Sequence, residues 1–329
     1  MAQRIEISYR TIIFTLAILI GAWFLYQIRD ILLLLFISLI LMGALNPTIN
    51  KLEKWRLPRW LAILVVYIVV VGLFIGSLAG IVPALVDQTG KLVQLVVESV
   101  AKTSFFGFSA ENLNGYLSQL GGLPSQILKI AVSAASNVLS IFVVLVITFY
   151  LLLEHKNLNH YLFYLFGREG KRRAKKIVTI LEKKLGGWVR AELFLMVIVG
   201  ALSYFGFKIL NLKSALPLAI LAGILEVVPN IGPTVAAVPA VLVGFLETPL
   251  IGFLVLAWCF VVQQLENNLI VPKVMQKSTG VNPLVTILSL AVGFKLAGVI
   301  GAILAVPLYL FFETLAKELL ISSYKNKRR

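Results

Sequence analysis

Most of the chain is divided into apolar runs that are long enough, or almost long enough, to cross a membrane as a helix. A crossing helix needs about 20 mainly apolar residues. The first five runs occupy residues 11–28, 31–45, 60–82, 127–153 and 191–210. They predict five crossing helices, of which the first two are joined by a tight hairpin at Arg29 and Asp30.

Two further apolar segments, residues 214–246 and 283–315, contain residues that break helices. These residues are Pro229, Gly232 and Pro233 in the first segment and Pro283, Gly293 and Gly298 in the second. Each half of a broken segment is too short for a comfortable crossing. Each segment therefore either re-enters the membrane as a hairpin or crosses it once with an unwound centre. One apolar helix beginning at residue 251 separates them, which suggests a hairpin–helix–hairpin unit.

These patterns predict an all-α polytopic membrane protein with about six crossing helices and two broken or re-entrant helical hairpins. Counting both broken segments as complete crossings gives about eight spans instead. The predicted units are N-terminal membrane helices (1–153) with an external amphipathic segment (83–126), a basic cytoplasmic amphipathic linker (154–190), a C-terminal transport unit (191–319) and a basic tail (320–329).

The composition supports a membrane protein and excludes other classes. Of the 329 residues, 59% are hydrophobic and only 14% are charged. In a soluble domain about a quarter of the residues are charged. A soluble fold of this size cannot hide so much apolar surface, so an ordinary cytosolic enzyme and a disordered chain are both excluded.

The charge of the chain is strongly basic, with 30 Lys and Arg against 15 Asp and Glu. Basic residues gather in residues 51–59, 155–190 and 317–329 and are sparse in residues 83–126. Cytoplasmic loops of membrane proteins collect Lys and Arg. We therefore expect both termini and the basic regions in the cytoplasm, the sparse region outside, and no nucleic-acid partner.

Residues 171–189 combine an apolar stripe with basic residues outside it. The stripe consists of Ala174, Ile177, Leu181, Leu185 and Trp188, which recur at helical spacing. This pattern is typical of a helix that lies on an anionic membrane surface. We therefore expect anionic lipid as a partner at residues 171–190, where the helix is either a passive connector or a lipid-regulated switch.

Polar side chains gather around the breaks, where non-helical backbone survives only if it is buried in protein or lines a watery cavity. The candidate solute- or ion-binding residues are Glu226, Asn230, Gln263, Gln264, Glu266, Asn267, Asn268, Asn282 and Lys295. Glu226 is either a structural acid bonded to freed backbone, or an acid that binds a proton, a cation or the substrate. Lys295 either pairs with Glu226 or Glu266 or extends to the membrane surface.

The amide side chains of Gln264, Asn267 and Asn268 share one face of a predicted helix. Amides offer donors and acceptors without a charge, which suits a hydroxyl-rich neutral solute or a partly dehydrated cation. The alternative is that they form the polar end of a crossing helix. As a hypothesis, this face lines one cavity with Glu226 and Asn230.

The sequence lacks recognisable motifs for catalysis or cofactor binding. No G-x-x-x-x-G-K-[ST] phosphate loop occurs, and the only two histidines, His155 and His160, do not form H-E-x-x-H. The single cysteine, Cys259, excludes an intrachain disulfide and a thiolate metal cluster. We therefore expect no enzymatic activity, no metal and no cofactor.

An ordered set of short motifs runs through the last third of the chain. The set comprises Glu226-Val-Val-Pro229-Asn-Ile-Gly232-Pro233, Pro239, Gln264-x-Glu266-x-Asn268, Pro272-Lys273, Asn282-Pro283-Leu284, Gly293, Gly298-Val-Ile-Gly301 and Val306-Pro307. On these residues the sequence resembles the autoinducer-2 exporter (AI-2E) family. Asn230, Asn282 and Lys295 depart from the pattern of that family, which puts the substrate in question more than the family.

The resemblance implies a multi-pass transporter of a bacterial-type inner membrane that works by a moving hairpin domain. It also implies a homo-oligomer, with a pentamer as one candidate assembly. We therefore predict a secondary transporter for a small polar solute similar to autoinducer-2. The alternatives are a Na⁺(Li⁺)/H⁺ antiporter, whose cargo is a monovalent cation, and a non-transporting membrane scaffold.

Overall fold

The computed structural model describes residues 9–73, 75–76, 79, 83, 138–212, 215–229, 231–278 and 280–326. Within these ranges every regular element is a helix. Apart from residue 83, the predicted external segment 83–126 lies outside the described residues, and so does the end of the basic tail.

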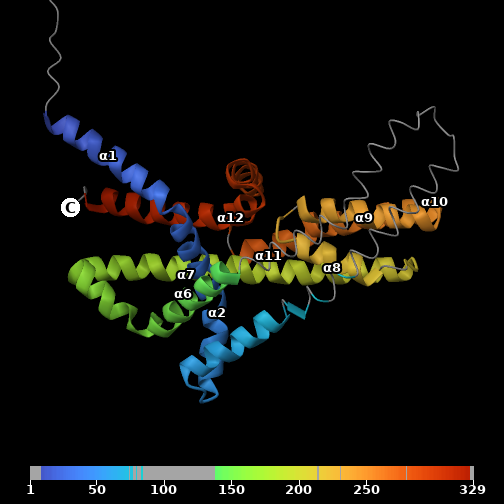
Figure 1. Ribbon diagram of the computed structural model, residues 1–329, viewed down its shortest axis with the longest axis horizontal. Helices are drawn as coiled ribbons and strands as arrows, with labels where there is room; N and C mark the ends of the chain where they lie inside the picture. The colour runs from blue at the N-terminus through green and yellow to red at the C-terminus, as the bar shows by residue number, and fades with distance from the viewer. Residues whose placement is uncertain are drawn as a thin grey trace, which may run out of the picture.

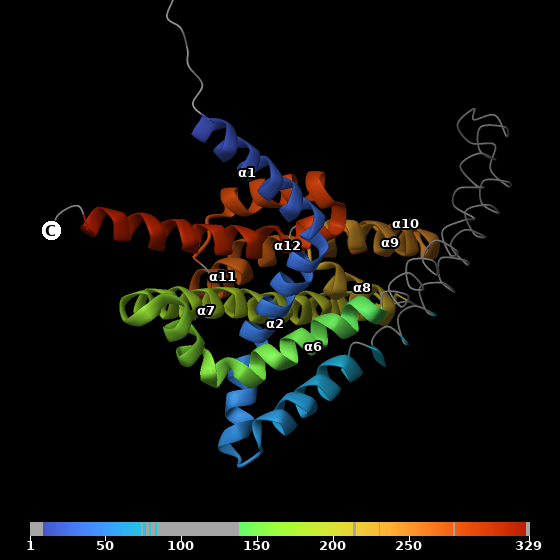
Figure 2. The same ribbon diagram turned by 60° about the vertical axis from the view of Figure 1, so that its left-hand side comes forward.

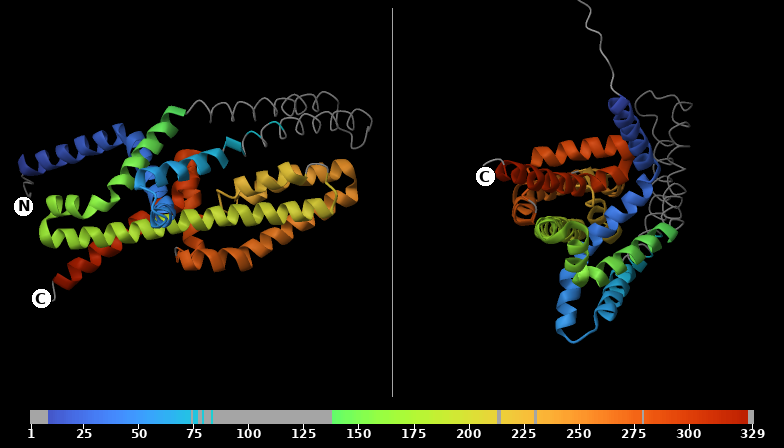
Figure 3. Two further views of the ribbon diagram at one scale, coloured as in Figure 1. Left: turned by 90° about the horizontal axis from the view of Figure 1, so that it is seen from below. Right: turned by 90° about the vertical axis from the view of Figure 1, so that its left-hand side faces the viewer.

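The helices fall into an N-terminal and a C-terminal group. The first contains α1 (Tyr9–Gln27), α2 (Arg29–Lys54), a helix over Arg59–Leu73, α6 (Val138–Glu154), the short turn η1 (His155–Asn157) and α7 (Leu158–Ile209). The second contains α8 (Ala215–Leu225), α9 (Ile231–Glu247), α10 (Pro249–Leu265), the π-helical segment η2 (Glu266–Ile270), α11 (Val271–Ser278) and α12 (Pro283–Asn326). Helix α7 forms a long rod along which the C-terminal helices lie (Figure 1; Figure 3, left).

In the described ranges, six helices are long and apolar enough to cross a membrane. They cover Tyr9–Gln27, Arg29–Lys54, Val138–Asn157, Gly170–Ile209, Pro249–Met275 and Leu284–Glu318. Three shorter apolar helices cover Arg59–Leu73, Ala215–Leu225 and Ile231–Phe245. The prediction of an all-α polytopic membrane protein, with about six long spans and shorter apolar helices, is confirmed.

Helix α7 contains most of the predicted linker (154–190) and of the predicted fifth span (191–210). It bends at Gly167, where φ is 65°, and then continues as one helix. The stripe residues Leu185 and Trp188 are buried against Phe36 of α2 and Leu310 of α12. The expectation that this stripe lies on the membrane surface is therefore wrong for these residues, because α2 and α12 supply an apolar protein surface that covers them.

Helices α2 and α7 cross in very close contact at two glycines. A Cβ atom added at Gly186 would collide with the backbone carbonyl of Gly43. The close approach brings Arg190 to the same backbone, and its Nη1 donates to the carbonyl oxygens of Gly43 at 3.0 Å and of Ala44 at 3.3 Å.

A polar network ties the end of α2 to neighbouring elements. The guanidinium of Arg59 donates to Oδ1 of Asn46 and to Oε2 of Glu53, both at 2.8 Å. Glu182 of α7 accepts from Nδ2 of Asn46 at 2.5 Å and contacts Nε2 of His155 at 2.9 Å. The carboxylates of Glu53 and Glu182 therefore both have polar partners within the protein.

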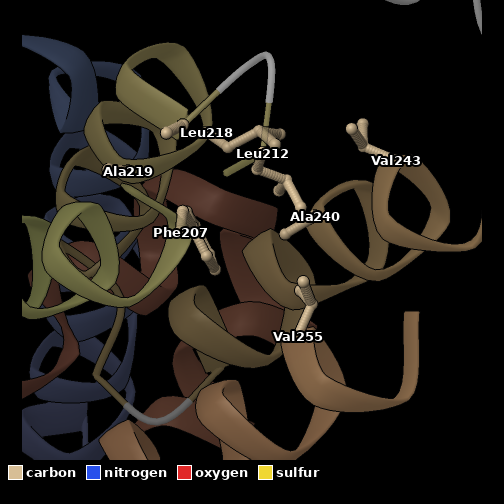
Figure 4. Packing of buried hydrophobic residues seen from close by; sticks show 8 residues of the cluster. Phe207, Leu212, Leu218, Ala219, Ala240, Val243 and Val255 are labelled. Atoms are coloured by element: carbon tan, nitrogen blue, oxygen red, sulfur yellow. The ribbon is translucent and has the colours of Figure 1, made fainter. Parts of the chain in front are cut away.

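In the C-terminal group, α8 and α9 form a hairpin that packs against α7 and α10. The core of this contact takes one or more side chains from each helix, including Phe207 of α7, Leu218 of α8, Ala240 of α9 and Val255 of α10 (Figure 4). The contact fixes the hairpin against the long helix.

Helix α12 also turns back on itself (Figure 2). The turn lies at Ala297 and Gly298, and Gly298 has a φ of 60°, which a residue without Cβ adopts easily. The two arms touch at Gly293 and Gly301, where a Cβ added at either glycine would collide with the backbone of the other.

Candidate functional site

The candidate site lies where four helices of the C-terminal group meet. Val199 of α7, Ala222 of α8, Ala236 of α9 and Val262 of α10 are all buried in one apolar cluster, which we name the four-helix contact. Three of these residues lie at helical spacing from a glutamate. Their positions therefore bring three carboxyl groups to the edge of the contact.

The three glutamates are Glu192, Glu226 and Glu266, which we name the carboxylate cluster. Glu226 and Glu266 each follow a contact residue by four positions, and Glu192 precedes Val199 by seven, so each lies on the inward face. Glu192 is 3% exposed, and Glu226 and Glu266 are each 0% exposed.

In the part of the chain that the structure describes, the carboxylate cluster has no polar partner outside itself. No N–H or O–H group donates to a side-chain oxygen of Glu192, Glu226 or Glu266. The carboxyl groups of Glu226 and Glu266 lie close enough to share a hydrogen bond when one of them is protonated. The three groups interact electrostatically with one another. Burial of an ionised carboxyl group without a partner costs several kcal/mol. The cluster therefore requires a proton or a bound cation that neutralises its charge.

The local backbone around two of these glutamates is irregular. Helix α8 ends at Leu225, and the chain passes through Glu226 to Pro229 without helical structure before α9 begins. Gly232, in the first turn of α9, lies so close to Leu225 that an added Cβ would collide with its carbonyl. Glu266 begins the π-helical segment η2, a type of element that is frequent at functional sites.

The two broken segments meet next to the carboxylate cluster. Val228, in the break between α8 and α9, packs against Leu290, Ala302 and Ala305 of α12. The hairpin formed by α12 therefore contacts the backbone break that carries Glu226. A movement of either hairpin would change the surroundings of that glutamate.

The predicted amide face lies away from these carboxyl groups. Gln264, Asn267 and Asn268 are exposed, and Nδ2 of Asn268 donates to Oε1 of Gln264 at 2.9 Å. Gln263 is half-buried and faces Thr234 of α9, with its Oε1 3.5 Å from the threonine hydroxyl. The structure thus brings Glu226 and Glu266 together but leaves these three amides on an outer surface.

The remaining predicted residues occupy other places. Asn282 is exposed, and its Oδ1 accepts from the backbone N–H of Leu284 at 2.9 Å, at the start of α12. Lys295 is exposed next to the turn of α12 and forms no ion pair with Glu226 or Glu266. Asn230 lies outside the described residues.

The predicted helix-breaking residues are divided between turns and helix starts. Pro229 lies in the break itself, whereas Gly232 and Pro233 are buried in the first turn of α9, where a missing backbone donor does little harm. Pro283 is the first residue of α12, and Gly293 and Gly298 lie at the contact and the turn between its arms.

Glu192 is the site residue that the sequence pattern did not reveal. It lies near the start of an apolar run, directly after Arg190 and Ala191, and this position is typical of the polar end of a helix. The signal that could have revealed it is its spacing of seven residues from Val199, on the face that carries Leu195 as well.

The arrangement of these groups suits the binding of a proton. Over the described residues, no group of three or more His, Cys, Asp or Glu side chains has a geometry that could hold a metal ion. The three carboxyl groups nevertheless interact, and two of them flank irregular backbone. Such a cluster can take up and release a proton when the helices around it open.

Comparison with known proteins gives matches over most of the chain. The model of the family described as "AI-2E family transporter" matches residues 12–321. "Putative transport protein YueF" of Bacillus subtilis is 29% identical over 301 residues, covering 84% of this chain and 81% of that protein. "AI-2 transport protein TqsA" of Escherichia coli is 28% identical over 293 residues, with the same two coverages of 84% and 81%.

Proposed function

Because the chain belongs to the AI-2E transporter family, we propose that it is a secondary transporter that moves a small polar solute across the cell membrane. The chain is a multi-pass membrane protein of a transporter family and not an enzyme. The observation that carries the proposal is the carboxylate cluster. A group of buried carboxyls with no partner outside the cluster is costly in a structural role and useful in a coupling role.

The proposed solute is similar to autoinducer-2, because TqsA is named as an AI-2 transport protein. The exposed amides of Gln264, Asn267 and Asn268 supply hydrogen-bond donors and acceptors suited to a hydroxyl-rich molecule. Their position on an outer surface fits a first contact with the solute, or a surface covered by another subunit of the proposed homo-oligomer, for which a pentamer is the candidate.

The proposed coupling mechanism follows from electrostatics. When a proton or a cation neutralises the carboxylate cluster, the packed arrangement of α7, α8, α9 and α10 is stabilised. When the neutralising ion leaves, repulsion and the need for hydration favour an arrangement in which the α8–α9 hairpin opens. A gradient of that ion then drives the hairpin movement.

A second candidate function, cation exchange for protons, is favoured by the same cluster. Carboxyl groups bind sodium or lithium ions and protons in competition, so an exchanger needs no separate solute site. In either case we propose that both termini face the cytoplasm and that residues 83–126 face outward, as the distribution of basic residues indicates.

Purified protein in liposomes tests the proposal directly. We expect uptake of autoinducer-2 when a proton or sodium gradient is imposed, and none in protein-free liposomes. Sodium movement that is driven by a pH gradient and is independent of the solute would instead support the exchanger. Absence of both fluxes would contradict both transport functions and leave the scaffold.

A further inference from the structure

A basic cavity of about 500 Å³ lies between α7 and α11, separate from the carboxylate cluster. Its lining includes Lys183, Gly187, Arg190 and Phe194 of α7 together with Lys273 of α11. The α7 residues are spaced by four, three and four positions, so they share one face of the helix. Three of the five carry a positive charge, and none of the lining residues is acidic.

The positive charge of this cavity is not neutralised by the surrounding protein. In the described part of the chain, Lys183, Arg190 and Lys273 form no ion pair with a carboxylate. Neighbouring lysines differ, because Lys184 pairs with Glu313 at 2.8 Å and Lys176 pairs with Glu318 at 2.8 Å. Some basic side chains of α7 therefore form ion pairs with glutamates, whereas those that line the cavity can bind an anion from outside the protein.

Arg190 is held in place for such a role. Its Nη1 donates to the carbonyl oxygens of Gly43 and Ala44, which fixes the guanidinium at the crossing of α2 and α7. A guanidinium has five N–H donors in a planar fork, so further donors remain for a ligand. A fixed guanidinium flanked by two lysines is the arrangement that recognises phosphate groups.

We infer that this cavity binds a phosphate group, and that its main source is the headgroup of an anionic lipid. Phe194 lines the cavity and is 52% exposed, so it offers an apolar surface for an acyl chain next to the basic side chains. Basic pockets between membrane helices bind anionic headgroups in this manner. The site differs from a helix lying on a membrane surface, because the apolar side chains Leu185 and Trp188 of α7 pack on protein.

A lipid bound in this cavity would lie next to the carboxylate cluster, which is the site proposed for coupling. Ala191 lines the cavity and directly precedes Glu192, whose side chain lies on the buried side of α7. Lys273 lies in α11, which follows the π-helical segment that begins at Glu266. A bound headgroup would therefore join α7 to α11 and hold together two helices that carry or adjoin carboxylates of the cluster.

Lipid binding by the purified full-length protein in detergent tests the inference. Phosphatidylglycerol, phosphatidylcholine and inorganic phosphate are added separately, and the melting temperature is followed, because a ligand that binds the folded state raises it. We expect phosphatidylglycerol to raise the melting temperature more than phosphatidylcholine. In the Lys183→Gln, Lys273→Gln double variant the apparent affinity should fall about tenfold or more, because charge-assisted contacts are lost.

A matched control separates the cavity from general charge effects. The Lys51→Gln, Lys208→Gln double variant removes the same charge from two exposed lysines that do not line the cavity. It should bind phosphatidylglycerol as the native protein does. If inorganic phosphate raises the melting temperature of the native protein but not of the Lys183→Gln, Lys273→Gln variant, that result would support a phosphate site in the cavity and show that free phosphate binds there too. The inference would be overturned if phosphatidylglycerol raised the melting temperature of both double variants equally. It would also be overturned if neither phosphatidylglycerol nor inorganic phosphate changed the melting temperature of the native protein.

Discussion

At the scale of single residues, α7 carries one half-buried and one buried carboxyl group with opposite surroundings. Glu182 of α7 contacts both Asn46 and His155, whereas Glu192, three turns further along, has no hydrogen-bond partner among the described residues. A partnered carboxylate stabilises the fold through its contacts. A carboxylate without a partner must be retained for another reason, which we propose is ion coupling.

This contrast gives a prediction about stability. Glu192→Leu should leave the melting temperature unchanged or raise it, because an apolar side chain of similar size removes a buried group that has no partner. Glu182→Leu should lower the free energy of unfolding by about 1–3 kcal/mol, because Asn46 and His155 lose their acceptor. Thermal unfolding of the two variants in the same detergent measures the difference. An equal and large loss in both would show that Glu192 is a structural residue.

At the scale of elements, close crossings at glycines determine how α7 packs. Gly186 meets the backbone of Gly43 in α2, and further along α7 the side chain of Trp258 in α10 occupies the space where Gly206 would carry a Cβ. These contacts allow α7 to pack closely with α2 at one position and with α10 at another. The long helix thus links the N-terminal helices to the C-terminal group.

Gly186→Ala should destabilise the protein by about 1–3 kcal/mol, because the new methyl group overlaps the carbonyl of Gly43 and the helices must move apart. Gly72→Ala is the matched control. No neighbouring atom lies within 4 Å of a Cβ added there, and alanine favours the helix more than glycine does. The melting temperature should therefore fall only in the first variant. A normal melting temperature for Gly186→Ala would contradict the close crossing.

The sequence pattern predicted where the helices lie better than it predicted which surfaces they pack against. Long apolar runs identified membrane-crossing helices because the thickness of a bilayer sets the length of a helix. The stripe that includes Leu185 and Trp188 was assigned to the wrong surface, because helical spacing shows an apolar face but not whether lipid or protein covers it. Its burial depends on α2 and α12, which are distant in sequence.

The candidate site was predictable in part for the same reason. Glu226 and Glu266 stand out as charges inside apolar segments, and the structure places them together. The amides beside Glu266 are close to it in sequence but are exposed on another face of the helix. Two of them lie in the π-helical segment that begins at Glu266. The spacing of Glu192 from Val199 places it on the apolar face of α7, but only the packing of α7 on α8 and α10 shows that this face meets the other two glutamates.

At the scale of the whole molecule, the two broken segments and the long helix form one assembly around the carboxylate cluster. The α8–α9 hairpin packs on α7 and α10, and the α12 hairpin packs on the break between α8 and α9 through Val228. A movement of one hairpin would therefore act directly on the other. We propose that the charge of the cluster controls this movement and so couples solute transport to an ion gradient.

The most direct test of that claim is gradient-driven accumulation of autoinducer-2 by liposomes containing native protein, Glu226→Gln or Glu154→Gln. Glu154 is the control, because its carboxylate accepts from Asn157 and Tyr161 at the end of α6, away from the cluster. We expect the native protein and Glu154→Gln to accumulate the solute, whereas Glu226→Gln should only equilibrate it passively. Accumulation by Glu226→Gln at the native level would contradict the claim.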